Sequence, residues 1–451
     1  MEIDMTTGKP AKKLWAFSLP MLFSVMFQQL YNIIDSVVAG KFAGKDALAA
    51  VGASYPLTML FLAFATGANI GCSVIVSQYF GAKKYGQMKT GIYTSLISIS
   101  VLSVILTVAG NICCNQLIRL LKTPESIFSD SALYLRIYIW GLFFLFLYNI
   151  TTGIFTAMGD SRTPLYFLIA SSVANMVLDY LFVARFHMGV AGVAWATFLC
   201  QGAAAVLSVI VLLRRIHQYS DENEKKRIYF SFPMLKKIGL VAIPSILQQS
   251  FISIGNLFIQ WEVNSYDTNV IAAYTSAVKL NTFVLTSLTT LANGLSSYTA
   301  QNMGAKKPER IPMGFRVSVV MVIVVCIPIV FLYCVFGTQM IGIFLDANEQ
   351  VDAVVKEGVR FLRIVSPFYF VVALKLMADG VLRGSGVMRC FMISTFTDLI
   401  LRVILSYLFS VVCGLGSLGI WLSWPVGWVA GAMLALWFYK SGRWKEMYLV
   451  A

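Results

Sequence analysis

The sequence predicts an all-α integral membrane protein, with twelve transmembrane helices in two parallel-repeat six-helix lobes around a central cleft. Three observations lead to this fold class: long apolar runs, few charged side chains and an internal repeat. Of the 451 residues, 58% are hydrophobic and 12% are charged. A soluble protein carries about twice that share of charge, whereas a side chain that faces lipid is costly to charge.

Apolar runs long enough to cross a bilayer as helices occur six times in each half of the chain. The first six lie near residues 14–38, 49–80, 90–118, 134–158, 163–183 and 190–213. The second six lie near residues 235–262, 270–301, 315–345, 361–386, 391–413 and 415–439. We therefore expect an N-terminal lobe at residues 1–213, a cytoplasmic basic linker at 214–234 and a C-terminal lobe at 235–451.

The basic residues between the runs predict the orientation of the chain. Lys and Arg concentrate in the polar N-terminus, in the linker and in the loops of the same side, as cytoplasmic loops do. An even number of helices then places both termini in the cytoplasm, in a multi-pass protein of the cell (inner or plasma) membrane. The net charge of +14 does not indicate nucleic-acid binding, because these residues lie in short loops between apolar runs.

The two halves of the chain repeat each other. VSQYFGAKK at 76–84 reappears as TAQNMGAKK at 299–307, at an offset of 223, and YLRI at 134–137 reappears as FLRI at 361–364, at an offset of 227. Lobes with an even number of helices enter the membrane from the same side, so the repeats are parallel. Rocking two such lobes exposes the cleft between them to either side in turn, which favours a transporter over a channel or receptor.

Acidic residues that one half carries and the other lacks indicate a site in the N-terminal lobe. Asp35 in the first helix and Asp179 in the fifth have Ile259 and Ser406 as repeat partners. At 1.5 Å per residue, Asp35, Asp179 and Thr197 lie roughly 5–10 Å below the outer boundary. We predict a coupling site formed by Asp35, Asn175, Asp179 and Thr197, with Asn149 attached at greater depth.

Two carboxylates that lie close together in surroundings of low dielectric constant do not both stay ionised unless their charge is compensated. Either one of them binds a proton, or a cation lies between them. Asn and Thr oxygens suit a hard cation such as Na⁺, so we expect H⁺ or Na⁺ as the coupling ion and no other cofactor. The alternative is that each acid pairs structurally with a basic residue, but helices one, five and six carry no Lys or Arg at that depth.

The C-terminal lobe carries a different set of charges. Lys375, Asp379 and Arg383 follow one another at i, i+4 and i+8, and Asp398 precedes Arg402 by four residues. Such residues either neutralise one another in a structural network or line the cleft and meet substrate. The candidate cleft residues are Gln28, Tyr31, Asn32, Glu262, Lys375, Asp379 and Arg402, and the candidate hinges are the repeat-related prolines Pro20 and Pro244.

The segments FSLPMLFSVMFQQLYNIIDSVVAGKFAG, VSQYFGAKK, AMGDSRTPLY and GVAGVAWAT together resemble the multidrug and toxic compound extrusion (MATE) transporters, over nearly the whole chain. The resemblance implies export of organic, often cationic compounds in exchange for H⁺ or Na⁺. In one branch of that family an Asp on helix one, an Asn-x₃-Asp pair on helix five and a Thr on helix six carry the coupling. Those positions match Asp35, Asn175, Asp179 and Thr197 here. The branch that relies on acids of the C-terminal lobe matches less well, because Asp379 lies beside two basic residues.

The leading hypothesis is a secondary antiporter that exports amphipathic organic cations by alternating access. The alternative is a flippase or exporter of lipid-linked or polysaccharide precursors. A flippase needs several cationic cleft residues for a pyrophosphate, and here Lys375 and Arg402 are offset by acids. An enzyme is not expected, because no nucleophile, metal or base cluster is visible. We expect small organic substrates and the lipid bilayer as partners, a monomer, and no nucleic acid.

Overall fold

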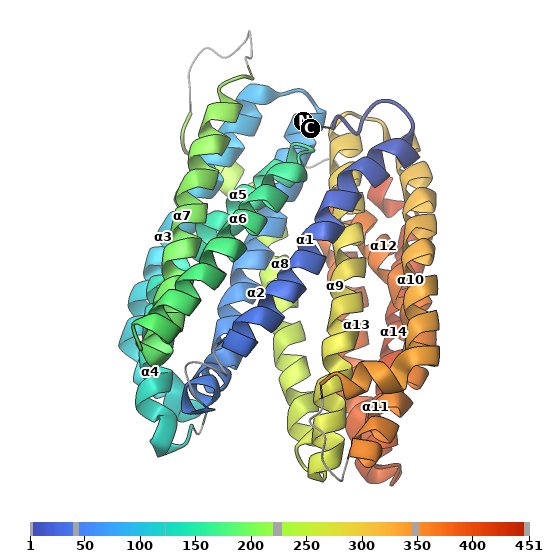
Figure 1. Ribbon diagram of the computed structural model, residues 1–451. Helices are drawn as coiled ribbons and strands as arrows, with labels where there is room; N and C mark the ends of the chain where they lie inside the picture. The colour runs from blue at the N-terminus through green and yellow to red at the C-terminus, as the bar shows by residue number, and fades with distance from the viewer. Residues whose placement is uncertain (1–2, 39–44, 122, 220–227, 345–350, 446–451) are drawn as a thin grey trace. The chain divides into compact units, whose positions relative to one another are not determined.

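The computed structural model describes residues 3–38, 45–121, 123–219, 228–344 and 351–445, without the side chains of 33–38, 45–48 and 351. The described residues form fourteen α-helices and several short 3₁₀- and π-helices, and they contain no β-strand (Figure 1).

The first half of the chain contains seven of these α-helices. They are α1 (Pro10–Val38), α2 (Lys45–Gly81), α3 (Tyr85–Leu120), α4 (Glu125–Trp140), α5 (Leu142–Ala157), α6 (Arg162–Asp179) and α7 (Gly189–Ile216). Helices α4 and α5 are bent by 47° at their junction and together have the length of one span. Helix α6 continues without a break into the π-helix η2 (Tyr180–Arg185).

The second half repeats this arrangement. Its α-helices are α8 (Phe232–Val263), α9 (Thr268–Gly304), α10 (Ile311–Gly342), α11 (Val351–Val365), α12 (Tyr369–Ser385), α13 (Met388–Tyr407) and α14 (Ser417–Lys440). The short helices are η3 (Pro308–Arg310), η4 (Ser366–Phe368), the π-helix η5 (Leu408–Val412) and η6 (Arg443–Lys445). The 3₁₀-helix η4 joins α11 to α12, and η5 extends α13, so this half also has six consecutive helical segments.

The twelve segments agree with the twelve predicted runs. Nine described segments are long and apolar enough to cross a membrane, and the bent pair α4–α5 makes a tenth. Helices α1 and α9 have the length of a span but are more polar, α9 because it is rich in Ser, Thr and Asn. The all-α fold class is confirmed, and the chain is a multi-pass membrane protein.

By packing, the chain divides into two compact units. Unit 1 is chiefly Leu19–Ser250, and unit 2 is chiefly Met5–Ser18 together with the chain from Phe251 onward. This division differs from the predicted boundary in the linker at 214–234. The first part of α1 packs with the second half of the chain, and the first part of α8 packs with the first half.

Small residues at repeat-related positions explain this exchange. In unit 1, a methyl group added at Gly71 of α2 would lie 2.4 Å from the Cβ of Ala242 in α8, so the two helices touch through their backbones. In unit 2, a methyl group added at Gly294 of α9 would lie 2.7 Å from the Oγ of Ser18 in α1. Gly294 is the repeat partner of Gly71, and Ala242 is that of Ser18. Close approach of small residues is a usual basis of helix packing in membranes.

A buried acid fixes the loop between α5 and α6. Asp160 accepts hydrogen bonds from the backbone N–H and the Oγ1 of Thr163, at 3.1 and 2.6 Å, and it forms an ion pair with Arg215 of α7. Burial acts to raise the pKa of Asp160, but the Thr163 hydrogen bonds and the Arg215 charge outweigh it, so this pKa lies below its ordinary value. The loop therefore ties the start of α6 to the end of α7.

Candidate cation site in unit 1 and charge network in unit 2

Helix α6 buries polar residues and exposes apolar ones. Its buried side chains are Ser172, Asn175 and Asp179, whose spacing of three and four residues places them on one face. Val173 and Val177 point away from this face and are about half exposed. A helix in lipid is expected to have this arrangement when its polar face serves a function inside the protein.

The polar face of α6 borders a cavity of about 160 Å³ in unit 1. Four of the predicted site residues line it, and they come from α1, α6 and α7: Gln28, Tyr31, Asn175 and Thr197. One water needs about 10–15 Å³ of such space, so the cavity has room for a cation with several waters. It is smaller than the roughly 300 Å³ at which pockets for drug-sized ligands begin.

A hydrogen bond sets the register between α1 and α6. The Tyr31 hydroxyl of α1 donates to the Oδ1 of Asn175 in α6. Asp35 follows Tyr31 by four residues on α1, as Asp179 follows Asn175 on α6, so each acid comes one turn after a member of this contact. Asp179 is buried, with 1% of its surface exposed. The Asp35 side chain lies outside the described residues.

Other polar groups of α7 and α1 surround this contact. Thr197 donates its hydroxyl to the backbone oxygen of Val193 at 3.1 Å, and its own oxygen keeps lone pairs for another partner. Cys200 lies within electrostatic range of Asn175 and Asp179. Asn32 is exposed and accepts a hydrogen bond from Gln28 at 3.3 Å.

Asn149 does not belong to the lining of this cavity. Its Nδ2 donates to the backbone oxygen of Leu145, one turn earlier in α5, at 2.9 Å. The polar lining residues that sequence reasoning missed are Tyr148, Ser171, Ser172, Cys200 and Gln201. Ser172 had a usable signal, since it lies three residues before Asn175 on the same face, whereas the others resemble ordinary helix-packing residues.

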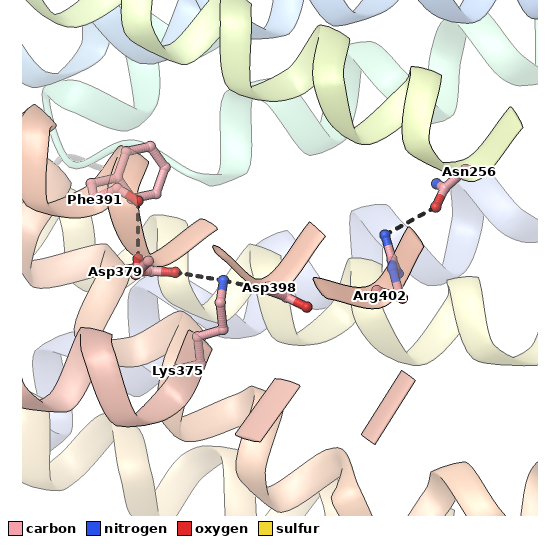
Figure 2. Close-up of polar contacts among 7 residues, drawn as sticks. Asn256, Lys375, Asp379, Phe391, Asp398 and Arg402 are labelled. Atoms are coloured by element: carbon pink, nitrogen blue, oxygen red, sulfur yellow. Dashed lines mark hydrogen bonds and ion pairs between the residues drawn. The ribbon is translucent and has the colours of Figure 1, made fainter. Parts of the chain in front are cut away.

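The buried charges of unit 2 form a network centred on Lys375 of α12 (Figure 2). Its Nζ lies 2.9 Å from the Oδ2 of Asp379 and 3.6 Å from the Oδ2 of Asp398 in α13. The Oδ1 of Asp379 also accepts a hydrogen bond of 2.6 Å from the Ser394 hydroxyl. One buried ammonium thus contacts two carboxylates, which come from α12 and α13.

The two arginines of this region have neutral partners. Arg383 donates to the Oδ1 of Asn293 in α9 at 2.6 Å. Arg402 donates to the Oδ1 of Asn256 in α8 at 3.2 Å (Figure 2). Its guanidinium carbon lies 4.4 Å from the centroid of the Trp424 ring. Neither arginine forms an ion pair with a described acid. Of the i, i+4 pairs in the sequence, therefore, only Lys375 with Asp379 is an ion pair here.

Glu262 is buried near the end of α8 rather than exposed at an interface. Its two carboxylate oxygens accept hydrogen bonds from Ser406 of α13 and Ser410 of η5. Glu262 is 8% exposed, and both serines are buried.

Comparisons with known proteins agree with this architecture. The MatE family model matches residues 20–181 and again 244–408, once in each half of the repeat. The chain is 30% identical to the probable multidrug resistance protein YpnP of Bacillus subtilis (strain 168), over 99% of this chain and 98% of that protein. It is 24% identical to an FAD transporter of Shewanella oneidensis, over 78% of this chain and 76% of that protein.

A solved structure shows the same fold. A MOP superfamily transporter from Pyrococcus furiosus superposes with a TM-score of 0.90 at 24% identity, over 97% of each chain. In the described part of the chain, twelve helical segments in two repeated halves, with the polar face of α6 buried, agree with a multi-pass membrane transporter. The chain belongs to the MatE family, whose members are transporters and not enzymes.

Proposed function

We propose that this transporter is a secondary antiporter, which exports amphipathic organic compounds, often cations, in exchange for H⁺ or Na⁺. The coupling ion binds at Asp35, Asn175, Asp179 and Thr197, as in the branch of the family that uses the N-terminal lobe. The observation that carries this proposal is the buried polar face of α6, which borders a cavity of about 160 Å³.

The size and the chemistry of the cavity support an ion rather than a drug as its occupant. Amide and hydroxyl oxygens line the cavity and are ligands that hard cations accept, and Asp179 follows the lining residue Asn175 by one turn of α6 without lining the cavity itself. Transport substrates of drug size need a larger space than this cavity provides. YpnP, which the chain matches over nearly its whole length, is a probable multidrug resistance protein, and we extend drug-like compounds as the substrate class to this chain.

A bend of α1 next to Pro20 is the proposed link between ion binding and transport. Proline has no backbone N–H to donate within the helix and bends it. The residues of α1 up to Ser18 pack with unit 2, and those from Leu19 pack with unit 1. Loading of the ion at Asp35 therefore acts on the part of α1 beyond this proline. We propose the same hinge role for Pro244 in α8, and we place both termini in the cytoplasm.

The proposal is tested by efflux from proteoliposomes with an imposed pH or Na⁺ gradient. Asp35→Asn and Asp179→Asn are each expected to abolish gradient-driven transport while the protein still folds. Glu125→Gln is the matched control, because Glu125 is an exposed acid at the start of α4, and it should transport as the wild type does. Transport by Asp179→Asn at the wild-type rate would remove that acid from the mechanism.

A further inference from the structure

Unit 2 contains a buried carboxylate about one turn after the position that the repeat assigns to Asp35 of the candidate cation site in unit 1. The repeat partner of Asp35 is Ile259, and Glu262 follows Ile259 by three residues on the same face of α8. The repeat partner of Asp179 is Ser406, whose hydroxyl donates to Glu262. Where unit 1 has an acid from each of two helices, unit 2 has an acid and a hydroxyl from the equivalent helices.

A π-helix follows this position in both units. In unit 1, η2 begins directly after Asp179, and in unit 2, η5 begins two residues after Ser406. A π-helix accommodates an extra residue per turn, and it occurs often at functional sites. In unit 2 the π-helix supplies Ser410, whose hydroxyl donates to the second oxygen of Glu262.

The surroundings of Glu262 have a negative electrostatic character. Glu262 lies in the last turn of α8, and Ser410 lies near the end of η5, where the negative ends of the helix dipoles add to the carboxylate charge. Among the described residues, no Lys, Arg or His nitrogen lies within 4.0 Å of Glu262. Tyr274 of α9 lies within electrostatic range of both Glu262 and Arg402 of α13, and Arg402 is directed at Asn256.

We propose that Glu262, Ser406 and Ser410 form a binding site for Na⁺. Each serine hydroxyl donates its hydrogen to the carboxylate and keeps oxygen lone pairs for a cation. Carboxylate and hydroxyl oxygens together are a ligand set for a hard cation. One monovalent ion balances the single carboxylate, whereas a divalent ion would leave a net charge in apolar surroundings.

This site is separate from the coupling site in unit 1, so the Na⁺ proposal can be tested independently of the proposed antiport. The test therefore uses a chain in which the acids of unit 1 are neutralised, Asp35→Asn/Asp179→Asn. Its thermal unfolding midpoint is measured in NaCl and in choline chloride at the same ionic strength, because choline is too large for the site. Binding of radiolabelled Na⁺ is measured in parallel.

The neutralised chain is expected to show a saturable rise of its midpoint with Na⁺ and to bind one Na⁺ per molecule. Adding Glu262→Gln removes both effects, although the amide can still hydrogen-bond the serines. Adding Ser410→Ala raises the half-saturating Na⁺ concentration about tenfold, because one ligand is lost. Glu357→Gln is the matched control: Glu357 also accepts a hydrogen bond from a serine, but it has Arg360 as an ionic partner at 3.6 Å, so the Na⁺ effects persist.

Two outcomes overturn the proposal. One is a neutralised chain with neither a Na⁺-dependent midpoint nor bound Na⁺. The other is a Glu262→Gln chain that keeps both effects. If the neutralised chain does not fold, the same comparison is made in the otherwise wild-type chain, where Glu262→Gln must lower the number of bound Na⁺ ions by one. Transport by the unit 1 variants does not enter either result.

Discussion

Replacement of Lys375 by methionine tests whether the buried charges of unit 2 have a structural role or a role in transport. The substitution keeps the length and the apolar stem of the side chain, but it removes the ammonium that lies 2.9 Å from Asp379 and 3.6 Å from Asp398. The buried carboxylate of Asp379 and the partly buried one of Asp398 then lose their common ionic partner. Removal of one partner of a buried ion pair costs about 3–5 kcal/mol, and we expect a loss of unfolding free energy in this range.

The double variant Lys375→Met/Asp379→Asn should recover part of this loss, because it also removes the carboxylate closest to the missing ammonium. Residues in direct contact couple by about 0.5–3 kcal/mol, and we expect a recovery of at least about 1 kcal/mol. Lys356→Met is the control. Lys356 is an exposed lysine of α11 in the same unit, and its replacement should change stability by less than about 0.5 kcal/mol.

The assay combines reversible unfolding in mixed micelles with initial transport rates per folded molecule. If the network is structural, Lys375→Met loses stability, and the folded fraction transports normally. A Lys375→Met chain within about 1 kcal/mol of the wild type would refute the reasoning. Loss of transport at unchanged stability would instead place Lys375 in the transport mechanism.

Three further predictions concern unit 1. The pKa of Asp160 is lower in the folded chain than its ordinary value of 3.8, so ionised Asp160 stabilises the fold fully above that value, and this contribution is lost as the pH falls through the folded pKa. Asp160→Asn weakens the Arg215 contact, so the difference in thermal unfolding midpoint between wild type and this variant should narrow as the pH falls below about 5. A difference that stays constant would contradict this prediction. Gly71→Val should lower the unfolding midpoint strongly, because the added atoms meet Ala242 at 2.4 Å; an unchanged midpoint would show that α2 and α8 can separate. Tyr31→Phe removes the hydrogen bond to Asn175 and should raise the half-saturating concentration of the coupling ion by about two- to tenfold in gradient-driven efflux. An unchanged value would show that this hydroxyl does not contribute to ion binding.

The spans and the repeat could be predicted from the sequence because both depend on local composition. The run predicted at 190–213, for example, is α7, Gly189–Ile216. Chain-wide packing could not be read in the same way. The exchange of the first parts of α1 and α8 between the units depends on Gly71 facing Ala242, a contact between distant segments that no local pattern indicates.

The candidate site was predictable where residue spacing determines the face of one helix. Asn175 and Asp179 share the buried face of α6 for this reason. Asn149 was a different case, because depth along a helix does not say which way a side chain points, and its amide bonds its own helix. In unit 2, sequence spacing suggested that Asp398 would pair with Arg402, but Asp398 lies against Lys375 instead, since contacts between helices compete with those along one helix.

The polar inner face of α6 has a consequence for biosynthesis. During translation α6 leaves the ribosome before α7, which later covers this face with Thr197 and Cys200. An aspartate raises the cost of inserting an isolated helix by up to about 2.5–3.5 kcal/mol at the helix centre and by less toward its ends, where Asp179 lies. Until α7 has been made, Asp179 must be shielded by an insertase, by water or by the helices already inserted. Truncated nascent chains that end within α6 should therefore partition into the bilayer less efficiently than chains that also contain α7.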